Sequence, residues 1–184
     1  NMRNALATVA LAETIGADRE AVRDALATFQ SVKRRMELRG VAGGVRVVDD
    51  FAHHPTAVRE TLAAVRARYP EGRLVAVYEP RSLTSRQRVF QSEYERSFDA
   101  ADVVVVARLF EPERYALDER LSPAELVAAV NDRGTEAHYV PTADEIVEFL
   151  VGRVEPGDTI AVMSNGGFDR IHDKLLAALG GAAA

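Results

Sequence analysis

Three short polar segments of the sequence hold the side chains best suited to chemistry. They are residues 49–55, 79–84 and 164–168, and each directly follows an apolar run of strand length. In open α/β sheets, ligands bind beyond the carboxyl ends of the strands. We therefore expect the three segments to gather on one rim of a sheet and to form one half of a cleft.

The first segment combines carboxylates with two histidines. Asp50 could accept hydrogen bonds from a ribose, and His53 and His54 could donate to an anion or exchange a proton near neutral pH. The alternative is that Asp49 and Asp50 cap the following helix and that both histidines are surface donors; the residues alone leave both interpretations open. Neighbouring side chains of an extended segment point to opposite faces, which disfavours a metal site made by the two histidines.

The second segment carries an arginine suited to anion recognition. Arg81 could hold a carboxylate or a phosphate through two parallel hydrogen bonds. The alternative is a solvated arginine in a loop that also contains Arg86 and Arg88. Ser82 and Thr84 are residue types that more often cap a helix than bind a substrate.

The third segment, Ser-Asn-Gly-Gly at residues 164–167, joins a predicted strand to a predicted helix. Glycine lets the backbone approach a ligand, and free N–H groups at a helix N-terminus favour an anion. A tight turn without a ligand is the alternative. The sequence has neither a G-x-G-x-x-G pattern nor a G-x-x-x-x-G-K-[ST] phosphate loop, so we expect this chain alone to be inactive toward ATP.

The elements that position these segments alternate between strands and helices. The apolar run 103–106 lacks alternation, as expected for a strand covered on both faces. Gly43-Gly44 predicts a hairpin. The whole pattern predicts a Rossmann-like, mostly parallel α/β sheet flanked by helices. Strands are predicted over residues 36–41, 45–49, 74–78, 103–107, 137–140 and 159–163.

The first part of the chain has a different pattern. Residues 2–29 predict two helices, the second with Asp18 as its N-cap, and the charged stretch 31–37 is interpreted as a linker. Because the chain opens with Asn1 rather than Met, we expect it to be a piece of a longer protein. Further along, residues 122–125 and 142–145 both have the sequence of a capping box.

Composition narrows the class of protein. The 184 residues suit one domain with an appendage, and 47% hydrophobic with 28% charged residues is typical of a soluble globular protein. The net charge of −5 argues against a nucleic-acid partner. The absence of cysteine excludes disulfides and thiolate metal sites, and is compatible with a cytoplasmic location. No apolar run approaches the roughly 20 residues that cross a membrane.

The same segments resemble the Mur ligases, ATP-dependent amide ligases that build the peptidoglycan precursor. Residues 49–56, D-D-F-A-H-H-P-T, resemble the signature that opens the C-terminal domain of these enzymes. The linker at 32–37 and the helix at 1–7 resemble motifs just before that domain. The resemblance implies that residues 1–35 are the last helices and linker of the central ATPase domain, and that residues 36–184 are the C-terminal domain.

The resemblance also implies a reaction. ATP phosphorylates the carboxylate of UDP-N-acetylmuramate, an amine attacks the acyl phosphate, and phosphate leaves, with Mg²⁺ held mainly by the central domain and no metal site in this chain. Residues 79–82 and 163–168 favour a member that joins the tripeptide L-alanyl-γ-D-glutamyl-meso-diaminopimelate during peptidoglycan recycling. Such an enzyme would need the N-terminal and central domains, which this chain lacks. A member that joins L-alanine and a stand-alone α/β binding module remain alternatives.

Site roles follow residue by residue from the resemblance. Arg35, Asp50 and His53 are expected to bind ATP, and His53 and His54 are the candidates for catalysis. This sequence departs from the family pattern at Leu83, where asparagine is usual, and at 169–170, where small residues are usual. The residues expected to bind the peptide are His54, Arg81, Ser82, Ser164, Asn165 and Phe168.

Overall fold

A computed structural model describes residues 2–29 and 32–181, and the chain divides into two compact units, residues 1–33 and 34–184. The first unit contains helices α1 (Met2–Thr14) and α2 (Arg19–Thr28). The carboxylate of Asp18 caps α2 by accepting a hydrogen bond from the backbone N–H of Ala21 at 2.8 Å. The two predicted helices and the predicted cap are therefore confirmed.

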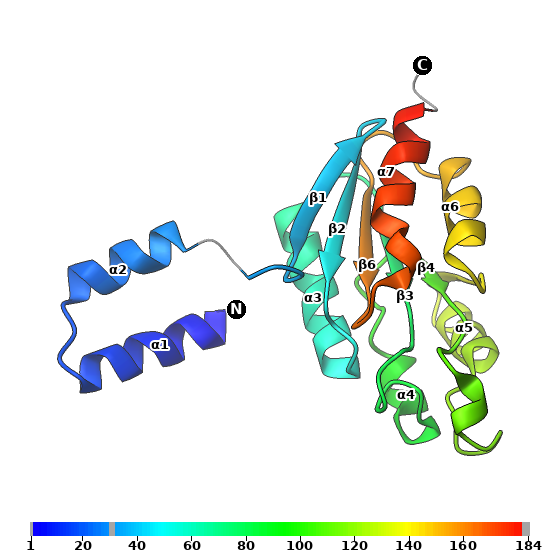
Figure 1. Cartoon of the computed structure of the whole chain (residues 1–184), viewed down its shortest axis with the longest axis horizontal. Coiled ribbons are helices and arrows are strands. Elements are labelled where there is room, and N and C mark those ends of the chain that lie inside the picture. The colour runs from blue at the N-terminus through cyan, green and yellow to red at the C-terminus, as the bar shows by residue number, and fades with distance from the viewer. Residues whose placement is uncertain (1, 30–31, 182–184) are drawn as a thin grey trace. The chain divides into compact units, whose positions relative to one another are not determined.

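The second unit is built on a six-stranded sheet in the order β1-β2-β6-β3-β4-β5 (Figure 1). β1 runs antiparallel to β2, and all other neighbours are parallel. This confirms the predicted mostly parallel sheet and its opening hairpin, with small shifts at strand ends. The strands are β1 (Glu37–Ala42), β2 (Val45–Asp50), β3 (Leu74–Tyr78), β4 (Val103–Val106), β5 (Glu136–Tyr139) and β6 (Thr159–Met163).

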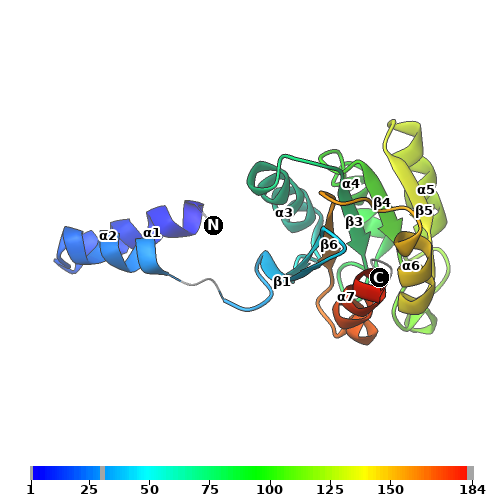
Figure 2. The same cartoon turned by 90° about the horizontal axis from the view of Figure 1, so that it is seen from above.

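Helices cover both faces of the sheet (Figure 2). The apolar side chains of α3 (Pro55–Arg68), α4 (Gln91–Tyr94) and α5 (Pro123–Asp132) pack on one face, and those of α6 (Ala143–Val151) and α7 (Ile171–Gly181) on the other. All four valines of β4 are buried, as expected for a strand that is covered on both faces of the sheet. Among the described residues, no helix has the length and apolar character needed to cross a membrane. Short 3₁₀ helices lie at Arg88–Phe90, Pro112–Arg114 and Phe168–Arg170.

The two predicted capping boxes differ in outcome. At α6 the box is complete, because Thr142 and Glu145 each bond the other's backbone N–H. At α5 the hydroxyl of Ser122 caps the backbone of Glu125, but the carboxylate of Glu125 bonds the Arg88 guanidinium instead, at 2.8 Å. The capping box at residues 122–125 is therefore only half formed. The Arg88 guanidinium, which can donate two parallel hydrogen bonds, lies within reach of Glu125.

The position of β6 determines where a ligand can bind. β6 lies between β2 and β3 although it is the last strand in the sequence. The chain leaves β2 and β3 toward the face that α3 and α4 cover, but it leaves β6 toward α7 on the opposite face. Connections that depart to opposite faces open a crevice beyond the carboxyl ends of the strands between them.

Candidate functional site

The three polar segments meet at the carboxyl ends of β2, β6 and β3. The last residues of the three strands, Asp50, Met163 and Tyr78, are paired in register across β2, β6 and β3. The backbone N–H of Ser164 donates to the carbonyl of Asp50 at 3.2 Å, and that of Glu79 donates to the carbonyl of Met163 at 3.1 Å. The expectation that the segments share one rim of the sheet is confirmed.

Ser164 and Glu79 form the buried base of the rim. The Ser164 hydroxyl is fully buried, donates to Oε2 of Glu79 at 2.5 Å and accepts from the backbone N–H of Gly166 at 2.9 Å. The other oxygen of Glu79 lies 3.6 Å from the guanidinium of Arg81. The Ser164 hydroxyl thus holds the carboxylate that pairs with Arg81, and the predicted contact of Ser164 with substrate stays a prediction.

Arg81 is held in place on three sides. Its guanidinium lies 3.6 Å from the ring centroid of Phe110 and pairs with Glu79. It also crosses directly over Gly166, where an added Cβ would come within 2.1 Å of Nε, so a larger residue there would displace the Arg81 side chain. Within the described part of the chain the guanidinium makes no hydrogen bond, and its side chain is 30% exposed. Its N–H donors are therefore oriented and available to a carboxylate.

Asn165 and Phe168 complete the β6–α7 turn. The Oδ1 atom of Asn165 is buried and has no hydrogen-bond partner among the described residues. Phe168 is buried against the α6–α7 side of the sheet, and its φ of 41° begins a left-handed run that continues with 48° at Asp169 and 55° at Arg170. Each such residue costs about 1–2 kcal/mol, and backbone strain of this kind concentrates at functional sites.

Ser82, also predicted to bind substrate, is engaged inside its own loop. Its hydroxyl accepts a hydrogen bond from the backbone N–H of Ser85 at 3.0 Å and lies 2.9 Å from the Ser85 hydroxyl. Ser82 therefore closes the turn that follows Arg81. This is the capping role common for serine, and its predicted contact with substrate stays a prediction.

The two histidines lie at the edge of the same rim, both half-buried. The carbonyl of His53 accepts hydrogen bonds from the hydroxyls of Tyr78, at 3.2 Å, and Tyr94. Burial raises the pKa of both tyrosines well above the ordinary value, so both remain donors at neutral pH. His54 immediately precedes α3, and its ring meets the edge of Phe90 with centroids 5.2 Å apart. The backbone at His53 is thus fixed while both imidazoles remain at the rim.

Asp50 fastens the start of the domain to the sheet. Its buried carboxylate accepts from the backbone N–H groups of Met36 and Ala52, both at 2.8 Å, and from the Thr61 hydroxyl at 3.2 Å. These bonds join the linker, the β2–α3 turn and α3. The predicted contact of Asp50 with a ribose stays a prediction, and it would use an acceptor that already serves three donors.

Arg34, rather than the neighbouring Arg35, connects the linker to the site. Its Nε lies 3.2 Å from Asp49, and its terminal nitrogen donates to the carbonyl of Ser164 at 2.6 Å. A left-handed φ of 58° turns it toward the sheet. Arg35 is exposed and makes no hydrogen bond or ion pair with the residues that the structure describes. The expected contact of Arg35 with ATP is untested by this arrangement and stays a prediction.

Asp49 is the centre of a buried cluster that the sequence did not single out. Besides Arg34, it faces Arg39 from β1 at 3.5 Å and Nε2 of His172 from α7 at 3.3 Å, the latter without hydrogen-bond geometry. Burial alone would raise the pKa of Asp49, but His172 and Arg34 outweigh it and hold the pKa below its ordinary value. The sequence did contain a signal for this cluster, the adjacent carboxylates Asp49 and Asp50. On a strand covered on both faces, neighbouring side chains point to opposite faces of the sheet, so both carboxylates must be buried.

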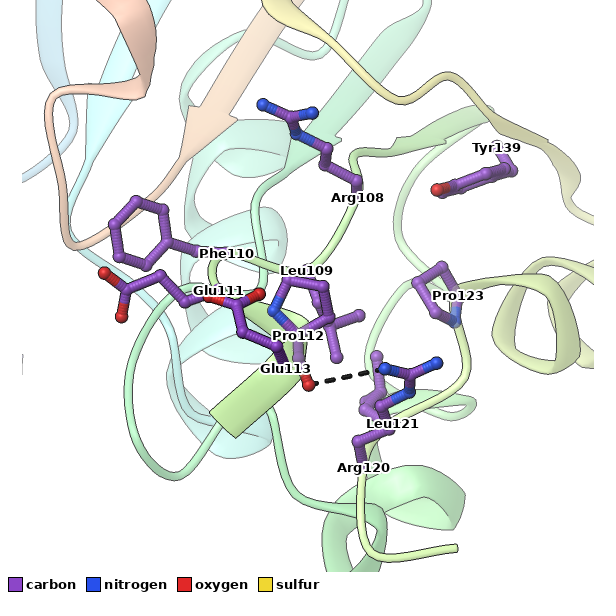
Figure 3. A pocket seen from close by; sticks show the side chains of 10 residues that line it. All are labelled: Arg108, Leu109, Phe110, Glu111, Pro112, Glu113, Arg120, Leu121, Pro123 and Tyr139. Atoms are coloured by element: carbon purple, nitrogen blue, oxygen red, sulfur yellow. Dashed lines mark hydrogen bonds between the residues drawn. The ribbon is translucent and has the colours of Figure 1, made fainter. Parts of the chain in front are cut away.

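A pocket of 640 Å³ opens beside this rim, beyond the ends of β4 and β5 (Figure 3). Phe110, whose ring supports Arg81, is part of its wall, so the pocket adjoins the Arg81 site. The sequence reasoning missed this pocket because its lining comes from a long irregular segment. The lining residues are Arg108, Leu109, Phe110, Glu111, Pro112, Glu113, Arg120, Leu121, Pro123 and Tyr139.

Comparison with known proteins gives the class. Residues 34–166 match the family described as Mur ligase, glutamate ligase domain, and the chain belongs to this family of ATP-dependent ligases. It is 40% identical over 181 residues to the UDP-N-acetylmuramate–L-alanyl-γ-D-glutamyl-meso-2,6-diaminoheptandioate ligase of Escherichia coli, covering 96% of this chain and 36% of the relative.

Two further relatives differ in their named substrates. The chain is 35% identical over 176 residues to the UDP-N-acetylmuramate–L-alanine ligase of Desulfitobacterium hafniense, covering 96% of this chain and 39% of the relative. A crystal structure of a murein peptide ligase from Psychrobacter arcticus superposes with a TM-score of 0.74 at 33% identity, over 97% of this chain and 36% of that one. The chain thus spans well under half the length of these relatives.

Proposed function

We propose that this chain is the C-terminal domain of a murein peptide ligase, an ATP-dependent enzyme that joins L-alanyl-γ-D-glutamyl-meso-diaminopimelate to UDP-N-acetylmuramate. Residues 1–35 would be the end of its central ATPase domain and the linker. The observation that carries the proposal is Arg81, held by Glu79, Gly166 and Phe110 with its donors available to a peptide carboxylate. The identity to the Escherichia coli enzyme, whose name gives this peptide, supports it.

In this reaction the muramyl carboxylate becomes an acyl phosphate, the amine of the peptide attacks its carbonyl carbon, an amide bond forms and phosphate leaves. The domain would orient the peptide and exclude water that would hydrolyse the acyl phosphate. His53 and His54, the candidates for catalysis, would accept the proton that the amine loses. Mg²⁺ would be held mainly by the central domain of the complete enzyme. Within the described ranges of this chain, no group of three or more His, Asp or Glu side chains could hold a metal ion.

The remaining partners follow from the reaction. ATP and UDP-N-acetylmuramate would be bound jointly with the N-terminal and central domains of the complete enzyme, with Arg35, Asp50 and His53 on the ATP side. The residues that would bind the peptide are His54, Arg81, Ser82, Ser164, Asn165 and Phe168. We propose a cytoplasmic enzyme with no nucleic-acid or membrane partner.

A second candidate is a ligase that adds L-alanine alone. Several similar relatives carry that name, including the enzyme from Desulfitobacterium hafniense. Membership of a ligase family argues against the third interpretation, a binding module without catalysis.

The proposal is tested by measuring phosphate release from ATP by the complete enzyme with UDP-N-acetylmuramate and either the tripeptide or L-alanine. We expect the tripeptide to support turnover. Release with L-alanine only would make the murein peptide assignment wrong. The 184-residue chain alone is the control; it has no phosphate-binding loop and is expected to release no phosphate.

A further inference from the structure

The pocket beyond β4 and β5 contains charged groups that the proposed chemistry does not use. Arg108 is exposed and its side chain makes no hydrogen bond or ion pair with the described residues. Arg120 makes a single bond, to the carbonyl of Pro112 at 3.3 Å. In the view of Figure 3 the Arg108 guanidinium points upward, away from Pro112, and that of Arg120 lies below Pro112 and to its right. Glu113 is exposed at the same wall and forms no ion pair within the described ranges.

The wall of the pocket is fixed rather than loose. The buried guanidinium of Arg86 donates to the carbonyl of Phe110 at 2.8 Å, and the backbone of Arg86 accepts from Leu121 at 2.8 Å. The backbone N–H of Phe110 donates to Pro80 at 3.1 Å, and that of Arg108 donates to Pro141 at 3.1 Å. Such anchoring fixes the backbone that carries the charged side chains, so only the side chains themselves lose freedom when a ligand binds.

The pocket adjoins the Arg81 site. Phe110 contacts the Arg81 guanidinium and also lines the pocket. A peptide with one carboxylate on Arg81 can therefore continue into the pocket, since each extended residue adds about 3.3 Å. A single amino acid such as L-alanine has no part that could extend this far.

We propose that this pocket binds the terminal diaminopimelate residue of the peptide. That residue has two carboxylates and one ammonium group, which match the two arginines, Arg108 and Arg120, and the carboxylate of Glu113. The inference rests on the proposed function and adds a specificity determinant to it. The pocket would distinguish the tripeptide from shorter amine substrates, while Arg81 would bind a carboxylate nearer the reacting amine.

The test uses the complete enzyme with two peptides, the tripeptide and the dipeptide L-alanyl-γ-D-glutamate, which lacks diaminopimelate. For Arg108→Gln we expect KM for the tripeptide to rise about tenfold and KM for the dipeptide to stay unchanged. Glu113→Gln should act in the same direction. The matched control is Arg133→Gln, whose arginine pairs with Asp99 on the surface, outside the pocket; its KM values should equal those of the unmodified enzyme.

Two outcomes would overturn the inference. An unchanged tripeptide KM in Arg108→Gln, or an equal rise for both peptides, would refute the diaminopimelate pocket while leaving the ligase assignment intact. An unmodified enzyme that turns over L-alanine but neither peptide would instead refute the proposed function, and the pocket with it. Because Arg108 is exposed, its replacement should not prevent folding.

Discussion

Replacing Asp49 with alanine is expected to lower the free energy of unfolding of the chain by about 3 kcal/mol, measured by urea denaturation at pH 7. The carboxylate is only 1% exposed and balances Arg34, Arg39 and His172. Its removal leaves two guanidinium groups facing each other at the junction of the linker, β1 and α7. Because both arginines are partly exposed, water would compensate some of the loss, which keeps the expected value at the lower end for a broken buried pair.

Asp173→Ala is the matched control. This carboxylate is 47% exposed and also pairs with Arg39, at 3.6 Å, and with Arg170. Exposed ion pairs contribute about 0–1 kcal/mol, so this variant should be nearly as stable as the unmodified chain. Equal losses for the two variants would contradict the view that the Asp49 cluster is a buried centre of stability.

The Asp49 carboxylate should also make the free energy of unfolding depend on pH. The pKa of Asp49 is lower in the folded chain than in the unfolded chain, where it is about 4. At a pH above this unfolded pKa, the ionised Asp49 carboxylate stabilises the fold. This contribution is lost as the pH falls through the folded pKa. Asp49→Asn should therefore lose less stability than the unmodified chain between pH 5 and pH 2, measured by denaturation at each pH. Parallel pH profiles would refute this.

Replacing Arg81 with alanine in the complete enzyme is expected to raise KM for the peptide by about 10- to 150-fold, because a hydrogen bond to a charged group contributes about 1.5–3 kcal/mol. The reason is geometric. Glu79, Gly166 and Phe110 surround the guanidinium, which makes no hydrogen bond within the described part of the chain and so keeps donors for a carboxylate. Initial rates measured over a range of peptide concentrations would give KM and kcat separately.

Arg88→Ala provides the control for Arg81, since Arg88 follows in the same loop but forms a surface pair with Glu125. Its KM should be unchanged. Arg81→Lys should recover only part of the affinity, because an ammonium group cannot form two parallel bonds. If Arg81→Ala leaves KM unchanged, Arg81 is a loop residue without contact to the substrate.

Much of the fold was predictable because it depends on local patterns. The buried strands β3 and β6 are uninterrupted apolar runs, and their predicted limits are those observed. Gly43 and Gly44 adopt positive φ at the hairpin, as glycine in such a turn allows. Parallel strands place their carboxyl ends on one edge, so the gathering of the three polar segments also followed from the sequence.

Pairings between distant residues were not predictable. Arg34 reaches Asp49 through the β1–β2 hairpin, in which Glu37 pairs with Asp49. His172 reaches Asp49 only because β6, the last strand in the sequence, lies beside β2 and leads into α7. Nothing local distinguishes Arg34 from Arg35, and the difference arises from a left-handed backbone at Arg34. The role of Ser164 as a buried partner of Glu79 likewise depends on strand order.

The departure from the family pattern after Phe168 has a physical counterpart. Asp169 and Arg170 adopt positive φ, a conformation that glycine tolerates best, which accounts for a preference for small residues there. In this chain each side chain gains an ion pair, Asp169 with Lys174 and Arg170 with Asp173. These exposed pairs offset only a part of the backbone strain. The departure at Leu83 has no such counterpart, because its side chain is exposed.

The central place of β6 also governs the order in which the molecule can form. During synthesis β2 and β3 emerge long before the strand that separates them, so their facing edges have no partner until residues 159–163 have left the ribosome. Unpaired strand edges invite misassociation, and pairing between distant segments is slow. The nascent domain therefore depends on delayed insertion of a single strand, and the rim that gathers the three polar segments is complete only once β6 has paired with β2 and β3.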